Sequence, residues 1–67
     1  MMDLYWQDII DIAIELSEKH EEIDPQWISF PDLYQKICDL DSFKDDPSRS
    51  NEKILEAIQM AWIEETR

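Results

Sequence analysis

Glycine is absent from the 67 residues of this chain, and cysteine and histidine occur once each. Without glycine, a glycine-rich loop that cradles a phosphate is excluded. An EF-hand beginning at Asp39 is excluded as well, because Lys44 stands at its sixth position, where calcium loops need glycine. The single histidine is expected at a helix end, and no nucleophile has a nearby base. The sequence therefore predicts a protein that is not an enzyme and that uses no organic cofactor.

Cys38 is the only cysteine, so neither an intrachain disulfide nor a zinc site built from cysteines can form. It is flanked by Ile37 and Leu40 and lacks an activating histidine, which favours a buried structural thiol over a nucleophile. The first residues lack the positive charge of a secretory signal, and acidic residues interrupt every apolar run far short of a membrane span. We therefore expect a cytoplasmic protein in a reducing environment, without membrane association.

Basic residues are also scarce: six lysines and arginines stand against seventeen acidic residues, for a formal charge of -11. Reading DNA requires several lysines and arginines to neutralise phosphates. From residue 32 to residue 65 the expected helices carry only Lys36 and Lys53, so nucleic acid is excluded. Basic protein surfaces and metal cations remain as partners, with an attraction that salt screens over about 8 Å. The same charge predicts a monomer.

Apolar residues make up 43% of the chain and predict a folded core despite the charge. From residue 3 to about residue 19 they follow helical spacing, and the expected buried stripe is Trp6, Ile9, Ile10, Ala13 and Leu16. At about 100° per residue, four acidic residues fall within an arc of about 80° away from this stripe. This carboxylate ridge consists of Asp8, Asp11, Glu15 and Glu18. It is either an ordinary solvated face or a binding surface.

The rest of the chain predicts two more helices. Residues 21–25 form a turn ahead of Pro25, and residues 27–30 form a brief strand or an extended connector. A second helix starts with the run 30–33, where Pro31 or Asp32 stands at a position that tolerates a missing or capped N–H, and it ends near residue 40. A third helix runs from about residue 51 to residue 65, capped by Ser50 or Asn51. The expected fold is mainly α: one domain, residues 1–67, of three helices in helix-turn-helix arrangement with at most one short strand.

Between the last two helices lies an acidic loop that contains Asp39, Asp41, Asp45 and Asp46. Two interpretations stay open for it. It is a solvated loop that caps a helix, or it is an oxygen-rich surface for a hard cation or a basic protein. His20, at the end of the first helix, is interpreted as a capping residue rather than a metal ligand, because a second histidine is missing.

Several segments resemble one family over nearly the whole chain. They are the run 37–40 (Ile-Cys-Asp-Leu), then Phe43, the run 45–47 (Asp-Asp-Pro), the run 50–58 (Ser-Asn-Glu-Lys-Ile-Leu-Glu-Ala-Ile) and Trp62. Upstream, the match continues in order through Trp6, Asp8, Leu16, Asp24, Pro25, Phe30 and Asp32. In these residues the chain resembles the IscX (YfhJ) family of the bacterial iron-sulfur cluster assembly system.

This resemblance implies a small acidic protein with a modified winged-helix fold. It also implies a role as adaptor or regulator of cluster assembly that binds the cysteine desulfurase IscS, and possible contact with other assembly components. Weak iron binding through surface carboxylates is implied too. The acidic positions that match the family are Asp8, Asp11, Glu22, Asp24, Asp39, Asp41, Asp45 and Asp46.

Two overlapping sets of site residues follow. The candidate iron ligands are Asp8, Asp11, Asp39, Asp41, Asp45 and Asp46. The candidate partner-binding residues are Asp8, Asp11, Glu15, Glu18, Glu22, Asp24, Asp39, Asp45 and Asp46. Exposed carboxylates without a surrounding shell of ordered ligands favour modest iron affinity that magnesium or calcium would compete with.

This chain departs from the family pattern at three positions. Ser42 and Lys44 lie inside a loop that is often more acidic, and Lys36 stands where a tryptophan is common. Fewer loop carboxylates weaken a loop-based metal site, so the ridge on the first helix gains importance. Two functions stay open: an adaptor or regulator that binds the desulfurase, and an iron carrier that supplies metal for cluster assembly.

Overall fold

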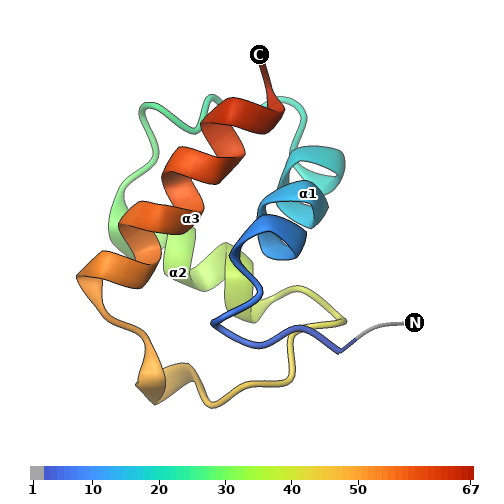
Figure 1. The fold of residues 1–67 in the computed structure, drawn as a ribbon. Coiled ribbons are helices and arrows are strands. Elements are labelled where there is room, and N and C mark those ends of the chain that lie inside the picture. The colour runs from blue at the N-terminus through green and yellow to red at the C-terminus, as the bar shows by residue number, and fades with distance from the viewer. Residues whose placement is uncertain (1–2) are drawn as a thin grey trace.

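The computed structural model describes residues 3–67 and contains three α-helices. Helix α1 spans Ile9–Lys19, α2 spans Phe30–Cys38 and α3 spans Glu52–Glu65, and a short 3-10 turn, η1, spans Pro47–Arg49. Helices α1 and α3 lie side by side and make the most extensive contact, and α2 packs against both (Figure 1). The expectation of a mainly α, three-helix domain is confirmed.

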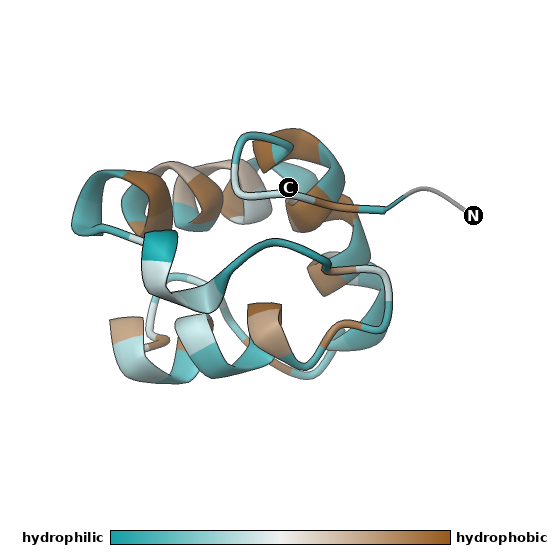
Figure 2. Ribbon diagram, turned by 90° about the horizontal axis from the view of Figure 1, so that it is seen from below, coloured by the Kyte–Doolittle hydropathy of each residue, from teal (hydrophilic) through white to brown (hydrophobic). Residues whose placement is uncertain are grey.

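All three helices contribute to one core, and apolar and polar residues alternate along each of them (Figure 2). The largest side chains that are fully shielded from solvent are Trp62, Ile12, Leu16, Leu33, Ile37 and Ile58. Residues outside the helices complete this core: Leu4 and Trp6 from the N-terminal segment, and Leu40 and Phe43 from the loop. The core therefore depends on a contact between two irregular segments that are about forty residues apart in sequence.

Side-chain caps define where the second and third helices begin. The Ser29 hydroxyl accepts a hydrogen bond from the Asp32 N–H (3.3 Å), and the Asn51 side-chain oxygen accepts one from the Ile54 N–H (2.9 Å). Each cap satisfies a backbone donor that has no partner within its own helix. The third helix is thus capped by Asn51, one of the two predicted residues, and α2 begins at Phe30, within the predicted run, with Ser29 as its cap.

The first helix differs from the prediction in its start and in its buried face. It begins at Ile9 and not at residue 3, because the preceding backbone pairs with the acidic loop: the Leu4 N–H donates to Ser42 (2.7 Å) and the Lys44 N–H donates to Leu4 (2.9 Å). Ile10, expected in the buried stripe, is 60% exposed, and Ile12 is fully buried. Two residues apart on a helix point about 200° apart, so only one of them can face the core.

Residues 27–29 form a connector and not a strand. The Trp27 N–H closes a turn by donating to the Asp24 carbonyl (3.1 Å), Ser29 is extended, and α2 starts at Phe30. Within residues 3–67 the β-type pairing consists of a single parallel bridge between Leu4 and Phe43. Phe43 itself is buried, which confirms that it folds the acidic loop back onto the core.

Candidate acidic docking site

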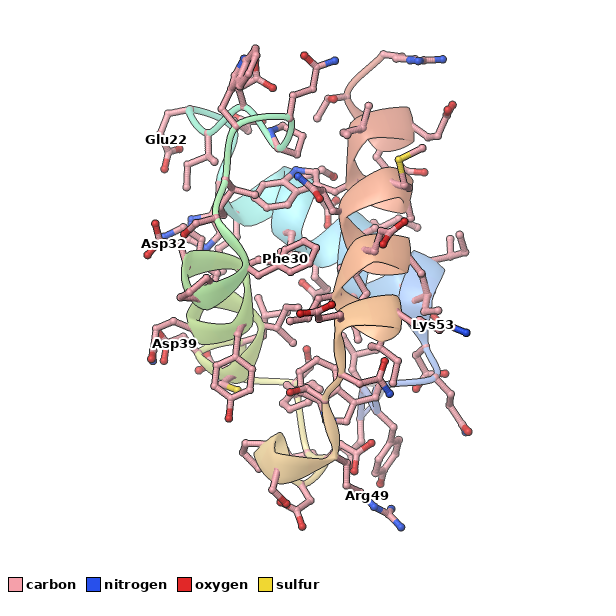
Figure 3. All side chains as sticks on the ribbon, turned by 90° about the vertical axis from the view of Figure 1, so that its left-hand side faces the viewer. Glu22, Phe30, Asp32, Asp39, Arg49 and Lys53 are labelled. Atoms are coloured by element: carbon pink, nitrogen blue, oxygen red, sulfur yellow. The ribbon has the colours of Figure 1, made fainter. Side chains whose placement is uncertain are left out.

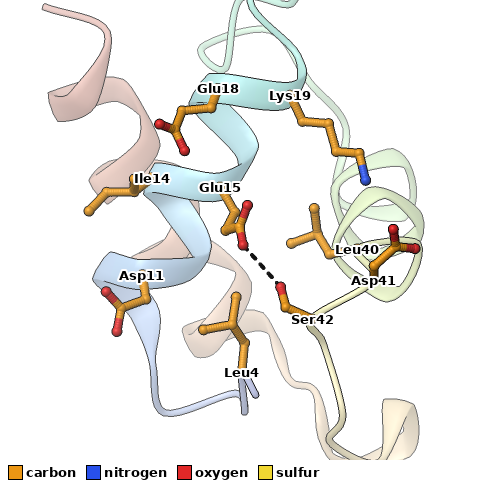
Figure 4. A pocket seen from close by; sticks show the side chains of 9 residues that line it. All are labelled: Leu4, Asp11, Ile14, Glu15, Glu18, Lys19, Leu40, Asp41 and Ser42. Atoms are coloured by element: carbon orange, nitrogen blue, oxygen red, sulfur yellow. Dashed lines mark hydrogen bonds between the residues drawn. The ribbon is translucent and has the colours of Figure 1, made fainter. Parts of the chain in front are cut away.

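A groove of about 620 Å³ opens between α1 and the segment that follows α2. Three apolar side chains, from Leu4, Ile14 and Leu40, lie among its walls. Its polar lining consists of Asp11, Glu15, Glu18, Lys19, Asp41 and Ser42 (Figure 4). Four carboxylates thus surround a partly apolar groove that has a single ammonium group on its lining.

A hydrogen bond connects the two walls of this acidic groove. The Ser42 hydroxyl donates to a Glu15 carboxylate oxygen at 3.1 Å (Figure 4). It restrains the Glu15 side chain and ties the loop to α1, so the spacing of the walls is set before a ligand arrives. Ser42, a departure from the acidic pattern expected in this loop, has a defined structural role here.

The four residues of the predicted carboxylate ridge have two different roles in the structure. Asp11, Glu15 and Glu18 all line the acidic groove, together with Asp41 from the loop. Asp8 is not part of its lining: its carboxylate accepts a hydrogen bond from the Tyr5 N–H (2.9 Å) in the turn that precedes α1. Sequence periodicity placed the ridge on one face, but it could not show that Leu4 and Leu40 would approach that face.

Two of the loop carboxylates hold the N-terminal segment and the 3-10 turn. Asp45 accepts a hydrogen bond from the Trp6 N–H (2.9 Å) and lies 4.0 Å from the Arg49 guanidinium. Asp46 caps η1 by accepting from the Ser48 N–H (3.0 Å) and from the Ser48 hydroxyl (2.8 Å). These hydrogen bonds lower the pKa of Asp46. Both carboxylates therefore have local structural partners.

The remaining predicted residues lie apart from the acidic groove. Asp39 accepts a hydrogen bond from the Gln35 side-chain amide (3.0 Å), and Asp24 accepts one from the Gln26 N–H (3.0 Å). Glu22 lies 3.8 Å from the His20 imidazole. His20 occupies the C-cap position of α1, where its backbone N–H donates to the Leu16 carbonyl, so its predicted place at the end of this helix is confirmed.

The carboxylates do not converge on a point where a metal ion would have three protein ligands. Across residues 3–67, no group of three or more histidine, cysteine, aspartate or glutamate side chains is close enough to hold one ion. A hard cation on this surface would therefore keep most of its water ligands, which is typical of weak, exchangeable binding.

Cys38 is partly buried near the end of α2, and Tyr34 lies one helical turn before it. Burial raises the pKa of the Cys38 thiol and outweighs the opposite effect of a hydrogen bond with Tyr34, while Asp39 raises it further. A thiol with a raised pKa carries little thiolate at neutral pH and is a poor nucleophile. This agrees with the structural role predicted for Cys38.

The fold and the acidic groove define a small, acidic, all-helical domain that presents carboxylates around apolar side chains. The chain matches the model of the iron-sulphur cluster assembly family over residues 4–67, and it belongs to that family, to which the IscX (YfhJ) resemblance pointed. It is also 53% identical over 64 residues to a protein of Pseudomonas aeruginosa named uncharacterized protein PA3808, covering 96% of this chain and 97% of that one. Within residues 3–67, no helix has the length and hydrophobicity that a bilayer crossing requires.

The cap formed by Asp46 predicts a pH-dependent loss of stability. Because the folded state lowers the pKa of this carboxyl below its ordinary value of 3.8, its contribution is complete above that value. The contribution is lost as the pH falls through the lower folded-state pKa. We expect Asp46→Ala to lower the free energy of unfolding at pH 6 and to do so much less near pH 2, as measured by urea denaturation. Glu56→Ala, on the exposed face of α3, is the control, and an Asp46→Ala effect that is independent of pH would contradict the role of the charge.

Proposed function

We propose that this protein is an adaptor or regulator of iron-sulfur cluster assembly that docks on the cysteine desulfurase IscS through its acidic groove. The observation that supports this most is the gathering of Asp11, Glu15, Glu18 and Asp41 around apolar side chains. Membership of the cluster assembly family supplies the biological setting. We assign the protein no catalytic step and place it in the cytoplasm with the assembly machinery.

The lining of the acidic groove suits the side chains of a basic protein segment. Lysine and arginine have long aliphatic stems that pack on apolar surface while their charged ends stay at the rim. Ile14 is only partly buried and offers such apolar surface, whereas Leu4 and Leu40 are 2% and 4% exposed and lie almost fully buried in the walls of the groove. The carboxylates would accept hydrogen bonds from the ammonium or guanidinium groups. The net charge of -11 would speed the encounter with a basic partner.

Charge reversal in the acidic groove should weaken the complex with the desulfurase. Asp11 and Glu18 line the groove and are suited to substitution because neither has a side-chain hydrogen bond in residues 3–67. We expect Asp11→Lys with Glu18→Lys to reduce the affinity about tenfold or more at physiological salt, since two attractions become repulsions. Calorimetric titration against the purified desulfurase, at low and physiological salt, measures this.

The matched control for this charge reversal carries the same change in net charge on another face. Glu56→Lys with Glu65→Lys alters two exposed residues of α3 that do not line the acidic groove. The control should lose much less affinity. Equal losses in the two double variants would mean that only the overall charge matters, and it would remove the acidic groove from the proposal.

Lys19 is the one basic residue in the lining of the acidic groove, and its side chain extends toward the side of the groove formed by Asp41 (Figure 4). Its ammonium group offsets part of the negative charge that a basic partner would meet. We therefore expect Lys19→Gln to tighten desulfurase binding about two- to fivefold, the range of a modest, solvent-exposed charge interaction. Lys53→Gln on α3 is the control, and the same calorimetric titration applies. Weaker binding by Lys19→Gln would show that Lys19 contacts the partner directly.

We also propose that iron binds weakly at carboxylates of the acidic groove, as cargo or as a signal. Carboxylate oxygens suit iron, and Asp11 and Asp41 are free of the structural hydrogen bonds that occupy Asp45 and Asp46. If iron and the desulfurase share this surface, each lowers the affinity of the other by the same factor. That coupling favours an iron-responsive regulator over the alternative of a simple iron carrier.

Ferrous iron binding tests this assignment directly. Asp11→Asn with Asp41→Asn should reduce the affinity for ferrous iron several-fold in anaerobic calorimetry, because two negative charges and two carboxylate donors are removed from the groove. Glu56→Gln with Glu65→Gln is the control, because it removes the same number of negative charges from exposed positions of α3 that do not line the groove. If the variant Asp11→Asn with Asp41→Asn bound iron as tightly as the wild-type protein, the iron site would lie at other residues. Desulfurase affinity that is unaffected by iron would favour the carrier.

A further inference from the structure

Trp27 is the most exposed large apolar residue of the described chain, with 81% of its surface accessible to solvent. The other two tryptophans, Trp6 and Trp62, are 3% and 0% exposed. Trp27 lies in the turn between α1 and α2 and borders a shallow hollow, away from the acidic groove. The hollow is lined by Ile23, Asp24, Trp27, Ile28, Asp32 and Lys36.

Three hydrogen bonds order the turn that carries Trp27. The Trp27 N–H donates to the Asp24 carbonyl at 3.1 Å, and the Asp24 carboxylate accepts from the Gln26 N–H at 3.0 Å. The Gln59 side-chain amide, on α3, donates to the Pro25 carbonyl at 2.8 Å. A partner that covers Trp27 therefore meets a backbone that is already ordered, which lowers the entropic cost of binding.

The charge around the hollow selects among the classes of partner. Glu22, Asp32 and Asp39 project along one edge of the molecule, from the turn and along α2 (Figure 3). Lys36 supplies one positive charge beside Asp24 and Asp32, so the hollow itself keeps an excess of negative charge. A second copy of this chain, with a charge of -11, and any phosphate-bearing surface would both be repelled. A basic protein is the class that complements this edge.

We propose that Trp27 and its hollow bind an arginine side chain of the same protein that occupies the acidic groove. The guanidinium would stack on the exposed indole, and Asp24 and Asp32 would accept its N–H groups. Arginine fits better than lysine because its planar group both stacks on an aromatic ring and forms paired hydrogen bonds with carboxylates. Tryptophan and arginine are also the residues that most often dominate the binding energy of interfaces. This inference rests on the proposed function.

One partner protein can contact both the hollow at Trp27 and the acidic groove, because the two lie at opposite ends of α2. The hollow includes Asp32 and Lys36 on α2, and the groove residues Leu40 and Asp41 follow the end of that helix. Nine helical residues extend about 13 Å. A standard interface of about 800 Å² per partner is roughly 30 Å across, so it is wide enough to cover both ends of the helix.

Substitution of Trp27 tests the inference against the purified cysteine desulfurase. We expect Trp27→Ala to weaken binding about tenfold or more in calorimetric titration, and Trp27→Phe to weaken it less, because the phenyl ring keeps part of the stacking surface. Asp32→Lys should also weaken binding. Met60→Ala, at a 56% exposed position of α3, is the matched control for loss of exposed apolar surface. Urea denaturation of each variant checks that the fold is retained.

The outcomes separate this inference from the proposed function. Full affinity in Trp27→Ala, combined with weak binding by Asp11→Lys with Glu18→Lys, would overturn the role of Trp27 and leave the acidic groove in place. No binding by the wild-type protein would overturn both. If sedimentation showed a wild-type dimer that Trp27→Ala abolishes, the occupant would be a second copy, and the arginine assignment would be wrong.

Discussion

The contact between Trp6 and the acidic loop is the interaction on which the rest of this small structure depends. The Trp6 backbone N–H donates to Asp45 (2.9 Å), and its indole N–H donates to the Asp46 carbonyl (2.8 Å). Its ring meets Phe43 edge to face, with 4.7 Å between centroids, and stacks on Tyr34 at 6.2 Å. Because a chain of this size has one small core, an aromatic cluster that joins the N-terminal segment, α2 and the loop contributes a large share of the packing that holds the fold together.

Packing of the N-terminal segment against the acidic loop also forms one side of the acidic groove. It determines which carboxylates have structural partners and which remain available in the groove. Pairing of Leu4 with the loop brings Leu4 and Leu40 to the face of α1 that carries Asp11 and Glu18. Asp45 and Asp46 are occupied in the process, since they hold Trp6 and η1. An acidic sequence thus divides its carboxylates between those that fix backbone donors and those that face solvent, and only the second group is free to bind a ligand without cost to the fold.

Sequence patterns predicted the helices well because helices are local. The apolar spacing and the Asn51 cap located α3 almost to the residue, and the acidic arc of α1 placed Asp11, Glu15 and Glu18 on one face. The predicted start of α1 was wrong because hydrogen bonds between Leu4 and residues 42 and 44 override helix propensity in the N-terminal segment. The predicted burial of Ile10 was wrong because Ile12, which points about 200° away from it, faces the core. The apolar lining of the acidic groove and the exposure of Trp27 were not predicted, because neither follows from periodicity along one element.

The excess of negative charge has opposite effects on the isolated protein and on its complexes. Unmixed carboxylates repel one another, as Asp11 and Glu15 do at one helical turn, and this repulsion opposes folding. A basic partner or a bound cation would remove part of this repulsion, so a fraction of the binding free energy would come from relieved repulsion and not from new contacts. Such binding weakens with salt, because salt also relieves the repulsion in the free protein. The charge that opposes folding of the isolated chain would therefore make association with a basic surface responsive to ionic conditions.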